Sequence, residues 1–263
     1  NCTMNQTEFI RTYRRRQKMT WILRAGILIL IFVLWEIAAR FKWIDDFIFS
    51  SPSRMAHTFV LMLEDGTIFK HICITLTETL VSFVLVMLLG TAIAVILWWQ
   101  RQVSDILEPY LVALNSLPKT ALAPVLIVWL GNNYKTIIVC ALLLAVFGTI
   151  IQLYAAFTTT DADKLLLIQT LGGHKKEQLL KVVLPGNFPT IIGSLKVNIG
   201  LCLVGVIIGE FLAANAGLGY LIIYSSQVFK LDTVMMSIII LCIVATVLYT
   251  SLSMLEKKYL SRR

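Results

Sequence analysis

Six long apolar stretches constrain the fold of this chain more than any other feature of its sequence. An α-helix needs about 20 predominantly apolar residues to cross the ~30 Å hydrocarbon core of a bilayer. Charged residues make up only 14% of the chain, whereas they are about 25% of a typical soluble domain. The sequence therefore predicts an all-α integral membrane protein with six transmembrane helices, at about 20–39, 72–99, 106–130, 134–158, 187–213 and 233–255.

The third stretch is interrupted by polar residues and prolines. Asn115, Ser116, Pro118, Lys119 and Pro124 all lie within it. A proline inside a helix frees backbone groups, which need protein or water partners at membrane depth. We therefore expect this segment to face the interior of the bundle or a cavity.

Lys and Arg are distributed unevenly between the two sides that six spans define. Fourteen lie in the N-terminal arm, the 99–107 turn, the 159–185 loop and the C-terminal tail, and six lie in the opposite loops. Because cytoplasmic loops are enriched in these residues, both termini and the 159–185 loop are expected in the cytoplasm. This pattern also accounts for the net charge of +8, so nucleic acid is not an expected partner. The expected division is a cytoplasmic arm at 1–19, a transmembrane domain at 20–255 and a basic tail at 256–263.

Motifs for enzymatic chemistry are absent from the sequence. It contains no GxxxxGK[ST] loop, no GxSxG turn and no HExxH pair, which would indicate a nucleotide site, an acyl-transfer nucleophile or a zinc site. The three histidines share no metal-ligand spacing, and the ionisable residues within the spans are single and separated. The sequence predicts a conduit or binding scaffold that is not an enzyme, holds no metal or cofactor, and takes its energy from elsewhere.

The loop at 159–185 is more apolar than a cytoplasmic connection requires. Asp161 and Asp163 can begin a short helix, and a run of leucines follows. Gly172 and Gly173 are expected to break this helix, and a second one at about 174–183 is expected to stop before Pro185. Two short helices with exposed leucines predict a knob that docks into a partner. The alternative is a loop that folds back on its own bundle.

The same loop resembles the coupling motif of ABC importer permeases, which reads EAA, three residues, Gly, nine residues, Ile, one residue, Leu-Pro. With the motif placed on Pro185, its Gly is Gly172, its Ile is Val182 and its Leu is Leu184. The EAA triplet falls on 166–168, so its acidic residue is missing, and the nearest acid is Asp163. The candidate coupling residues are Asp161, Asp163, Leu165, Leu166, Leu167, Ile168, Gly172, Gly173, Val182, Leu184 and Pro185.

Four further blocks extend the resemblance over nearly the whole chain, to permeases of the nitrate/sulfonate/taurine/bicarbonate group. They are LWEIAAR (34–40), FSSPSRM (49–55), NSLPKTALAPVLIVWLGNNYK (115–135) and GEFLAANAGLGYLI (209–222). The resemblance implies a six-helix permease bundle in the bacterial cytoplasmic membrane that pairs with an identical or related second permease. It also implies two cytoplasmic ABC ATPases, which hold ATP and Mg, and an extracytoplasmic solute-binding protein. Sulfonates, taurine, nitrate, bicarbonate and vitamin precursors are the solutes it leaves open.

Ionisable and polar residues within spans are candidates for the translocation pathway, because each costs free energy on insertion. Lys119 is interpreted either as a cation that lines the pore and attracts an anion, or as a lysine that snorkels or pairs with Glu210 or Glu78. Lys196 is expected to snorkel to the cytoplasmic side. The full candidate set for the pathway is Asn115, Pro118, Lys119, Glu78 and Asn198.

The stretch AANAGLGYLIIYSSQ after the fifth span is expected to be irregular. Irregular backbone at membrane depth is tolerated only where it is buried or lines water. We interpret it as an outer gate and part of the contact with the binding protein, with Glu210, Asn215, Gly217 and Gly219 as its residues. An ordinary glycine-containing loop is the alternative.

Two rival functions make different demands on the sequence. A secondary transporter driven by an ion gradient needs inverted repeats and buried carboxylate or proton relays. A membrane enzyme needs clustered acid–base or metal residues. Neither pattern is visible in the sequence, which favours the ATP-driven permease.

Overall fold

The computed structural model describes residues 6–260, and every element within that range is helical, as predicted. Of the predicted arm at 1–19 and the predicted tail at 256–263, residues 1–5 and 261–263 lie outside the described residues. The long helices are α1 (Gln6–Arg40), α4 (Thr67–Trp99), α5 (Arg101–Ser116), α7 (Tyr134–Thr158), α11 (Phe188–Ala213) and α13 (Leu231–Leu260). The shorter ones are α2 (Asp46–Phe49), α3 (Pro52–Glu64), η1 (Lys119–Leu122), α6 (Ala123–Leu130), α8 (Ala162–Thr170), α9 (Lys175–Gln178), η2 (Leu179–Val183), α10 (Leu184–Gly186) and α12 (Leu218–Gln227).

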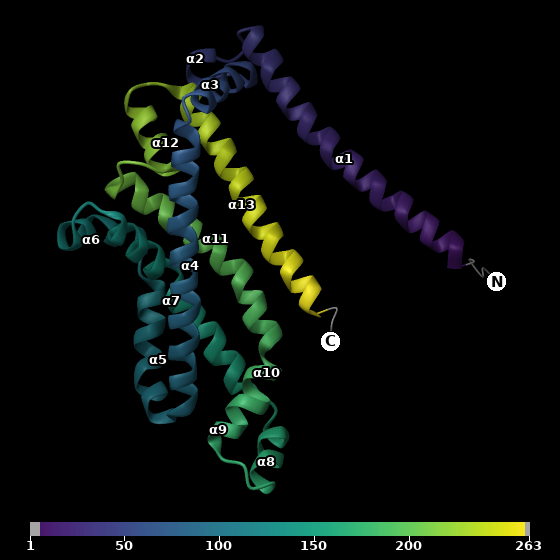
Figure 1. Ribbon diagram of the computed structural model, residues 1–263, viewed down its shortest axis with the longest axis vertical. Coiled ribbons are helices and arrows are strands. Elements are labelled where there is room, and N and C mark those ends of the chain that lie inside the picture. Colours follow the sequence, from purple (N-terminus) through teal and green to yellow (C-terminus); the bar gives the residue numbers. More distant parts are fainter. Residues whose placement is uncertain (1–5, 261–263) are drawn as a thin grey trace.

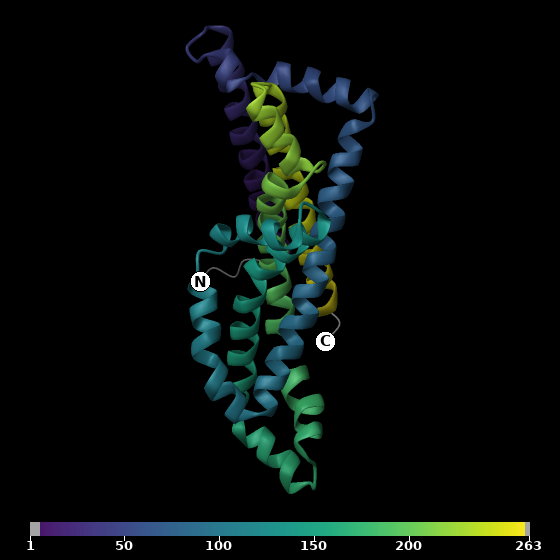
Figure 2. The ribbon, with the colours of Figure 1, turned by 90° about the vertical axis from the view of Figure 1, so that its left-hand side faces the viewer.

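Five of these helices are long and apolar enough to cross a membrane, and the sixth predicted span is a broken pair. The segments Arg101–Ser116 and Lys119–Leu130 meet at an angle of 84°. In Figure 2, α5 runs along the bundle, whereas α6 crosses it near mid-height. The cause is local, since Leu117 is extended (φ −65°, ψ 143°) before Pro118, as residues before proline prefer. The third predicted span, at 106–130, is therefore a bent pair of helices, and the bend falls at the predicted interruption.

The turn predicted at 99–107 is also wrong. The helix α4 ends at Trp99 and α5 begins at Arg101, so Gln100 alone reverses the chain. Gln100 is extended (φ −120°, ψ 93°), and its carbonyl accepts a hydrogen bond from the Ser104 N–H at 3.1 Å. The polar start of α5 is therefore helix instead of loop.

The centre of the bundle is formed by α4, α7 and α11, which pack closely because small residues lie at their crossings. A Cβ atom on Gly205 of α11 would lie 2.5 Å from Ala141 Cα of α7. A Cβ atom on Gly90 of α4 would lie 2.8 Å from the Thr149 side chain. Side chains larger than hydrogen at these points would separate the helices.

We expect Gly205→Ala to lower the thermal unfolding midpoint in detergent, because the new methyl group meets backbone that cannot move independently. Overpacking of this kind costs about 1–3 kcal/mol. Gly200→Ala is the matched control on the same helix, since nothing lies within 4 Å of a Cβ atom there. Equal midpoints for the two variants would contradict the close approach of α7 and α11.

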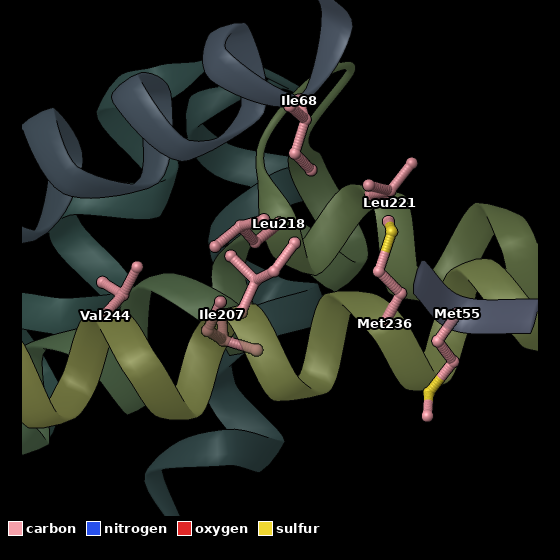
Figure 3. Packing of buried hydrophobic residues seen from close by; sticks show 8 residues of the cluster. Met55, Ile68, Ile207, Leu218, Leu221, Met236 and Val244 are labelled. Atoms are coloured by element: carbon pink, nitrogen blue, oxygen red, sulfur yellow. The ribbon is translucent and has the colours of Figure 1, made fainter. Parts of the chain in front are cut away.

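A hydrophobic cluster binds the short helices α3 and α12 to one end of the bundle. Its side chains come from α3, α4, α11, α12 and α13, and Leu218 lies beside Ile207 in Figure 3. The buried members are Met55, Ile68, Ile207, Leu218, Leu221, Met236, Ile240 and Val244. The segment that follows α11 is therefore anchored by packing over most of its length.

The first helix leaves the rest of the chain at a wide angle (Figure 1). It contacts the neighbouring helices near its C-terminal end, where Glu36 accepts hydrogen bonds from the Ser53 N–H and from Arg40 Nε. Only 6% of the most apolar window of its membrane-spanning part is buried. Most of the apolar surface of α1 thus faces outward from this single chain.

The two ends of the bundle carry different features. The helices α2 and α3 lie at one end, and α8 and α9 lie at the other (Figure 1). Both α1, toward its N-terminus, and α13, toward its C-terminus, run from the α2–α3 end toward the α8–α9 end. The described ends of the chain and the α8–α9 pair therefore share one side of the spans.

Candidate functional site

The helix α8 begins and ends where the sequence predicts. Asp161 caps its N-terminus, and its Oδ1 accepts a hydrogen bond from the Asp163 N–H at 3.0 Å. Gly172 has a φ of +81°, and the N–H of Gly173 donates to the Ile168 carbonyl at 2.9 Å. This left-handed turn closes the helix in the manner of a Schellman motif.

The second short helix of the knob does not stop before Pro185, as the sequence analysis expected. It continues through the π-helical turn η2 and α10 to Gly186. Pro185 follows directly on the π-helical turn, where the Leu184 N–H donates to the Leu179 carbonyl, so the proline without an N–H lies where the regular α-helical hydrogen bonding is already interrupted. Asn187 ends the helix, and its Nδ2 donates to Thr160 Oγ1 at 2.8 Å and to the Val183 carbonyl at 2.9 Å. These bonds join the two ends of the loop at its base.

Hydrogen bonds also order the start of this second helix. The His174 N–H donates to Glu177 Oε2 at 2.9 Å. The backbone N–H groups of Glu177 and His174 lower the pKa of the Glu177 carboxyl. Lys175 Nζ donates to the Trp99 carbonyl at 2.5 Å and lies 5.7 Å from the Trp98 ring centroid. The knob is thereby attached to the end of α4.

The leucines of α8 divide between two environments. Leu165 packs toward the buried cluster that contains Phe157, Leu179 and Val183, and Leu184 joins the same cluster. Leu166 and Leu167, by contrast, are each 57% exposed. One face of the knob thus folds back on the bundle, as the alternative in the sequence analysis expected. The other face keeps an exposed apolar surface.

Lys119 lies at the bend of the broken span. Its Nζ donates to Asn115 Oδ1 at 2.9 Å and to the Leu144 carbonyl at 3.2 Å, and it lies 6.0 Å from the Phe147 ring centroid. Among the side chains that the structure describes it pairs with no carboxylate, so the expected alternative of a pair with Glu210 or Glu78 is wrong. A positive charge with neutral partners therefore lies next to the exposed Asn115 and Pro118.

The remaining pathway candidates lie elsewhere. Asn198 is buried between helices, where its Oδ1 accepts from Thr149 Oγ1 at 2.9 Å and its Nδ2 contacts Met87 Sδ at 3.2 Å. Lys196, which was expected to snorkel to the cytoplasmic side, forms an ion pair with Glu256 near the C-terminal end of α13. The predicted pathway residues therefore do not form one site.

The segment after α11 is irregular only at 214–217, and the rest of the stretch expected to be irregular forms α12. Glu210 is 1% exposed. Its Oε1 accepts from Thr75 Oγ1 at 2.6 Å, and its Oε2 accepts from the Gly219 N–H at 2.5 Å. Thr75 Oγ1 in turn accepts from the Leu218 N–H at 2.8 Å. Of the four predicted gate residues, Glu210, Gly217 and Gly219 are buried together, whereas Asn215 is exposed.

Two further residues of α4 belong to this junction. His71 Nδ1 lies 3.0 Å from both the N–H and the carbonyl oxygen of Gly217. Glu78, three residues after Thr75 on α4, is also buried. The spacing of His71, Thr75 and Glu78 places all three on one face of α4, a signal that the sequence contained.

The described residues form a helical bundle with a broken span, a knob at one end and a hydrogen-bonded segment at the other. Residues 71–263 match the family described as the binding-protein-dependent transport system inner membrane component. The chain belongs to this family, the permeases of ABC importers.

Known proteins with similar sequences and folds agree with this assignment. The chain is 27% identical to the formylaminopyrimidine transport permease protein ThiX of Halalkalibacterium halodurans, over 73% of this chain and 76% of that protein. It is 22% identical to the taurine transport system permease protein TauC of Escherichia coli, over 94% of each chain. Its fold is similar to a chain in the crystal structure of a bacterial alginate ABC transporter in complex with a pentasaccharide-bound periplasmic protein. That match has a TM-score of 0.64 and 14% identity, and it covers 93% of this chain and 97% of the other.

Proposed function

We propose that this permease imports a small polar or anionic solute with energy from separate ATPase subunits that dock on the knob formed by α8–α10. The apolar surface of Leu166 and Leu167 on an ordered pair of helices is the observation that carries this proposal. ATP and Mg would be held by those two partners. A second permease, identical or related, would complete the pore, and an extracytoplasmic binding protein would deliver the solute.

The attachment of the knob suggests how motion would reach the spans. Lys175 joins it to the end of α4, and the cluster around Phe157 joins it to α7. A rigid lever of this kind would carry a displacement of the ATPases into the centre of the bundle. ATP can shift the equilibrium between inward and outward states only if it favours one of them, and here it would do so through the docked partner.

The proposed orientation places the knob and both termini in the cytoplasm of a bacterial cell. The excess of Lys and Arg on that side supports it. The opposite end, with α2, α3 and the 214–217 segment, would then face the binding protein. Asn215 is the exposed residue of the predicted gate and is our candidate for that contact.

The partners can be tested in native membranes. The chain, extracted in mild detergent, should retain an ATP-hydrolysing subunit that mass spectrometry identifies by its sequence. A chain that carries no ATPase in several detergents would favour the ion-gradient alternative. That alternative has one observation in its favour, the burial of the Glu78 and Glu210 carboxyls within the bundle.

Lys119 is the proposed contact for a negatively charged group of the solute. We expect Lys119→Met to reduce ATP-driven uptake of an anionic substrate about tenfold or more, because a hydrogen bond to a charged group contributes about 1.5–3 kcal/mol. Lys119→Arg should retain most of the uptake, since it keeps the charge. Lys135→Met removes a lysine outside the bend and serves as the control. Full uptake by Lys119→Met would exclude this role.

A further inference from the structure

A cavity of about 590 Å³ lies where the knob meets the bundle. Its walls come from the end of α4, the start of α5, the end of α7, and the short helices α8 and α9. In Figure 1, the start of α5 and the helix α9 lie toward the same end of the bundle. The volume is within the ~300–1,000 Å³ of typical small-molecule sites. The exposed Leu166 and Leu167 and the bend at Lys119 do not line this cavity, so it is distinct from both sites described above.

Charged side chains of both signs line the cavity and are open to a ligand. Arg101, Asp105 and Glu108 lie at positions i, i+4 and i+7 of α5, which share one face of a helix. Among the side chains that the structure describes, none of these three forms an ion pair. Lys175 lines the cavity from α9 and donates one hydrogen to the Trp99 carbonyl, which leaves two of its three donors. Two cations and two carboxylates can therefore contact a bound molecule.

A buried hydroxyl without a partner lies beside these charges. A smaller space of about 140 Å³ adjoins the cavity between α5 and α7, and Glu108 and Tyr154 line both. Ser104 lines the smaller space, is 0% exposed, and its Oγ has no hydrogen-bond partner. Buried hydroxyl groups are normally hydrogen-bonded, because an unpaired one costs free energy. Since Ser104 is four residues before Glu108 on the same helix, a donor held by Glu108 can also reach this hydroxyl.

We infer that this cavity binds a small zwitterion of the amino carboxylate or amino sulfonate class. The anionic group of the ligand lies between Arg101 and Lys175. Its ammonium group lies against Asp105 and Glu108 and donates to the Ser104 hydroxyl. An ion of one sign alone would meet like charges in half of the site. Arg101 and Asp105 are about 6 Å apart along the helix axis, so two or three carbon atoms between the charged groups are sufficient.

The bound zwitterion connects α5 to α9 and so holds the knob against the bundle. Every contact comes from this chain alone. The proposal therefore does not depend on an ATPase that docks on the knob, and the two can fail separately.

Binding of β-alanine to the purified permease in detergent tests this site. β-Alanine has two carbon atoms between its charged groups, whereas propionate and propylammonium each carry only one charge. We expect β-alanine at millimolar concentrations to raise the thermal unfolding midpoint saturably and to slow hydrogen exchange across 165–178. Propionate and propylammonium at constant ionic strength should change neither. The absence of a saturable response to β-alanine, or an equal response to either single ion, overturns the proposal.

Variants of the charged residues test the contacts. Arg101→Met and Glu108→Gln should each weaken β-alanine binding about tenfold or more, since each removes a hydrogen bond between charged groups. Lys176→Met is the matched control, because Lys176 is an exposed lysine of α9 outside the cavity, and it should bind β-alanine as wild type does. Wild-type affinity in both Arg101→Met and Glu108→Gln would overturn the assignment of these charges to a ligand.

Ser104→Ala separates a contact with the ligand from a structural role. Removal of an unpaired buried hydroxyl should leave the unfolding midpoint without ligand unchanged or raise it, whereas β-alanine binding should become weaker. Lys119→Met should keep wild-type binding, which distinguishes this cavity from the proposed pathway contact. Wild-type β-alanine binding in Ser104→Ala, or its loss in Lys119→Met, would contradict the site as described.

Discussion

Glutamate at both Leu166 and Leu167 is expected to abolish ATP-driven uptake without unfolding the permease. Both side chains are more than half exposed, so the isolated chain should tolerate the change. In the docked complex, each glutamate would be buried against an apolar surface. Central interface residues often contribute about 2 kcal/mol or more, so the double substitution should weaken ATPase binding by about 100-fold or more. Co-purification of the ATPase and ATP-driven uptake in proteoliposomes are the measurements.

The matched control for this experiment is the double change to methionine, which keeps apolar side chains of similar volume. It should retain both the ATPase and uptake. The thermal midpoints of the two double variants and of wild type should agree, because the exposed surface of α8 contributes little to the fold. Uptake that persists with glutamate at both positions would show that the knob is not the docking site.

Gly217→Ala is expected to cause the second large effect, at the opposite end of the bundle. Gly217 has a φ of +121°, a conformation that side chains other than glycine adopt only with strain. A Cβ atom there would also overlap the carboxyl group of Glu210. Strain and overlap together should cost about 2–6 kcal/mol. We expect a lower unfolding midpoint and faster hydrogen exchange across 214–221.

Two further variants separate the causes of this effect. Gly193→Ala is the control, because a Cβ atom at Gly193 has no neighbour within 4 Å. Adding Glu210→Ala to Gly217→Ala removes the overlap but leaves the backbone strain and breaks the bond to Gly219. The double variant should therefore lose less than the sum of the two single changes. Purely additive losses would indicate that the Glu210 carboxyl and the methyl group added at position 217 do not meet.

The sequence predicted the spans well because hydropathy over 20 or more residues depends little on how helices pack. The prolines at 118 and 124 also located the weak span, but its pattern did not reveal that the two halves meet at 84°. The corner at Gln100 was missed because the polar start of α5 resembles a loop in composition. Pro185 was interpreted as a stop, but the helix continues past it through the π-helical turn at Leu179–Val183.

Some candidate site residues have roles that depend on their sequence neighbours, and others have roles that depend on residues far away in the sequence. Asp161 and Gly172 act on their own helix, so their roles could be predicted from neighbouring residues. Thr75 and Glu210 are far apart in the sequence, and only the packing of α4 against α11 brings their side chains within hydrogen-bonding distance. The sequence analysis singled out the glycines at 217 and 219. The structure shows why glycine is needed at both positions, because the Glu210 side chain occupies the space that another side chain would fill.

The most direct test of the central claim is a photo-activated crosslinker placed at Leu167 in native membranes. The side chain there points away from the buried face of the knob, so the crosslink reports what covers it. We predict a single major product with a cytoplasmic ATPase, lost when the crosslinker is moved to the buried position of Val183. A crosslinker at Leu167 that reacts only with lipid or with this chain itself would contradict the docking of an ATPase on the knob.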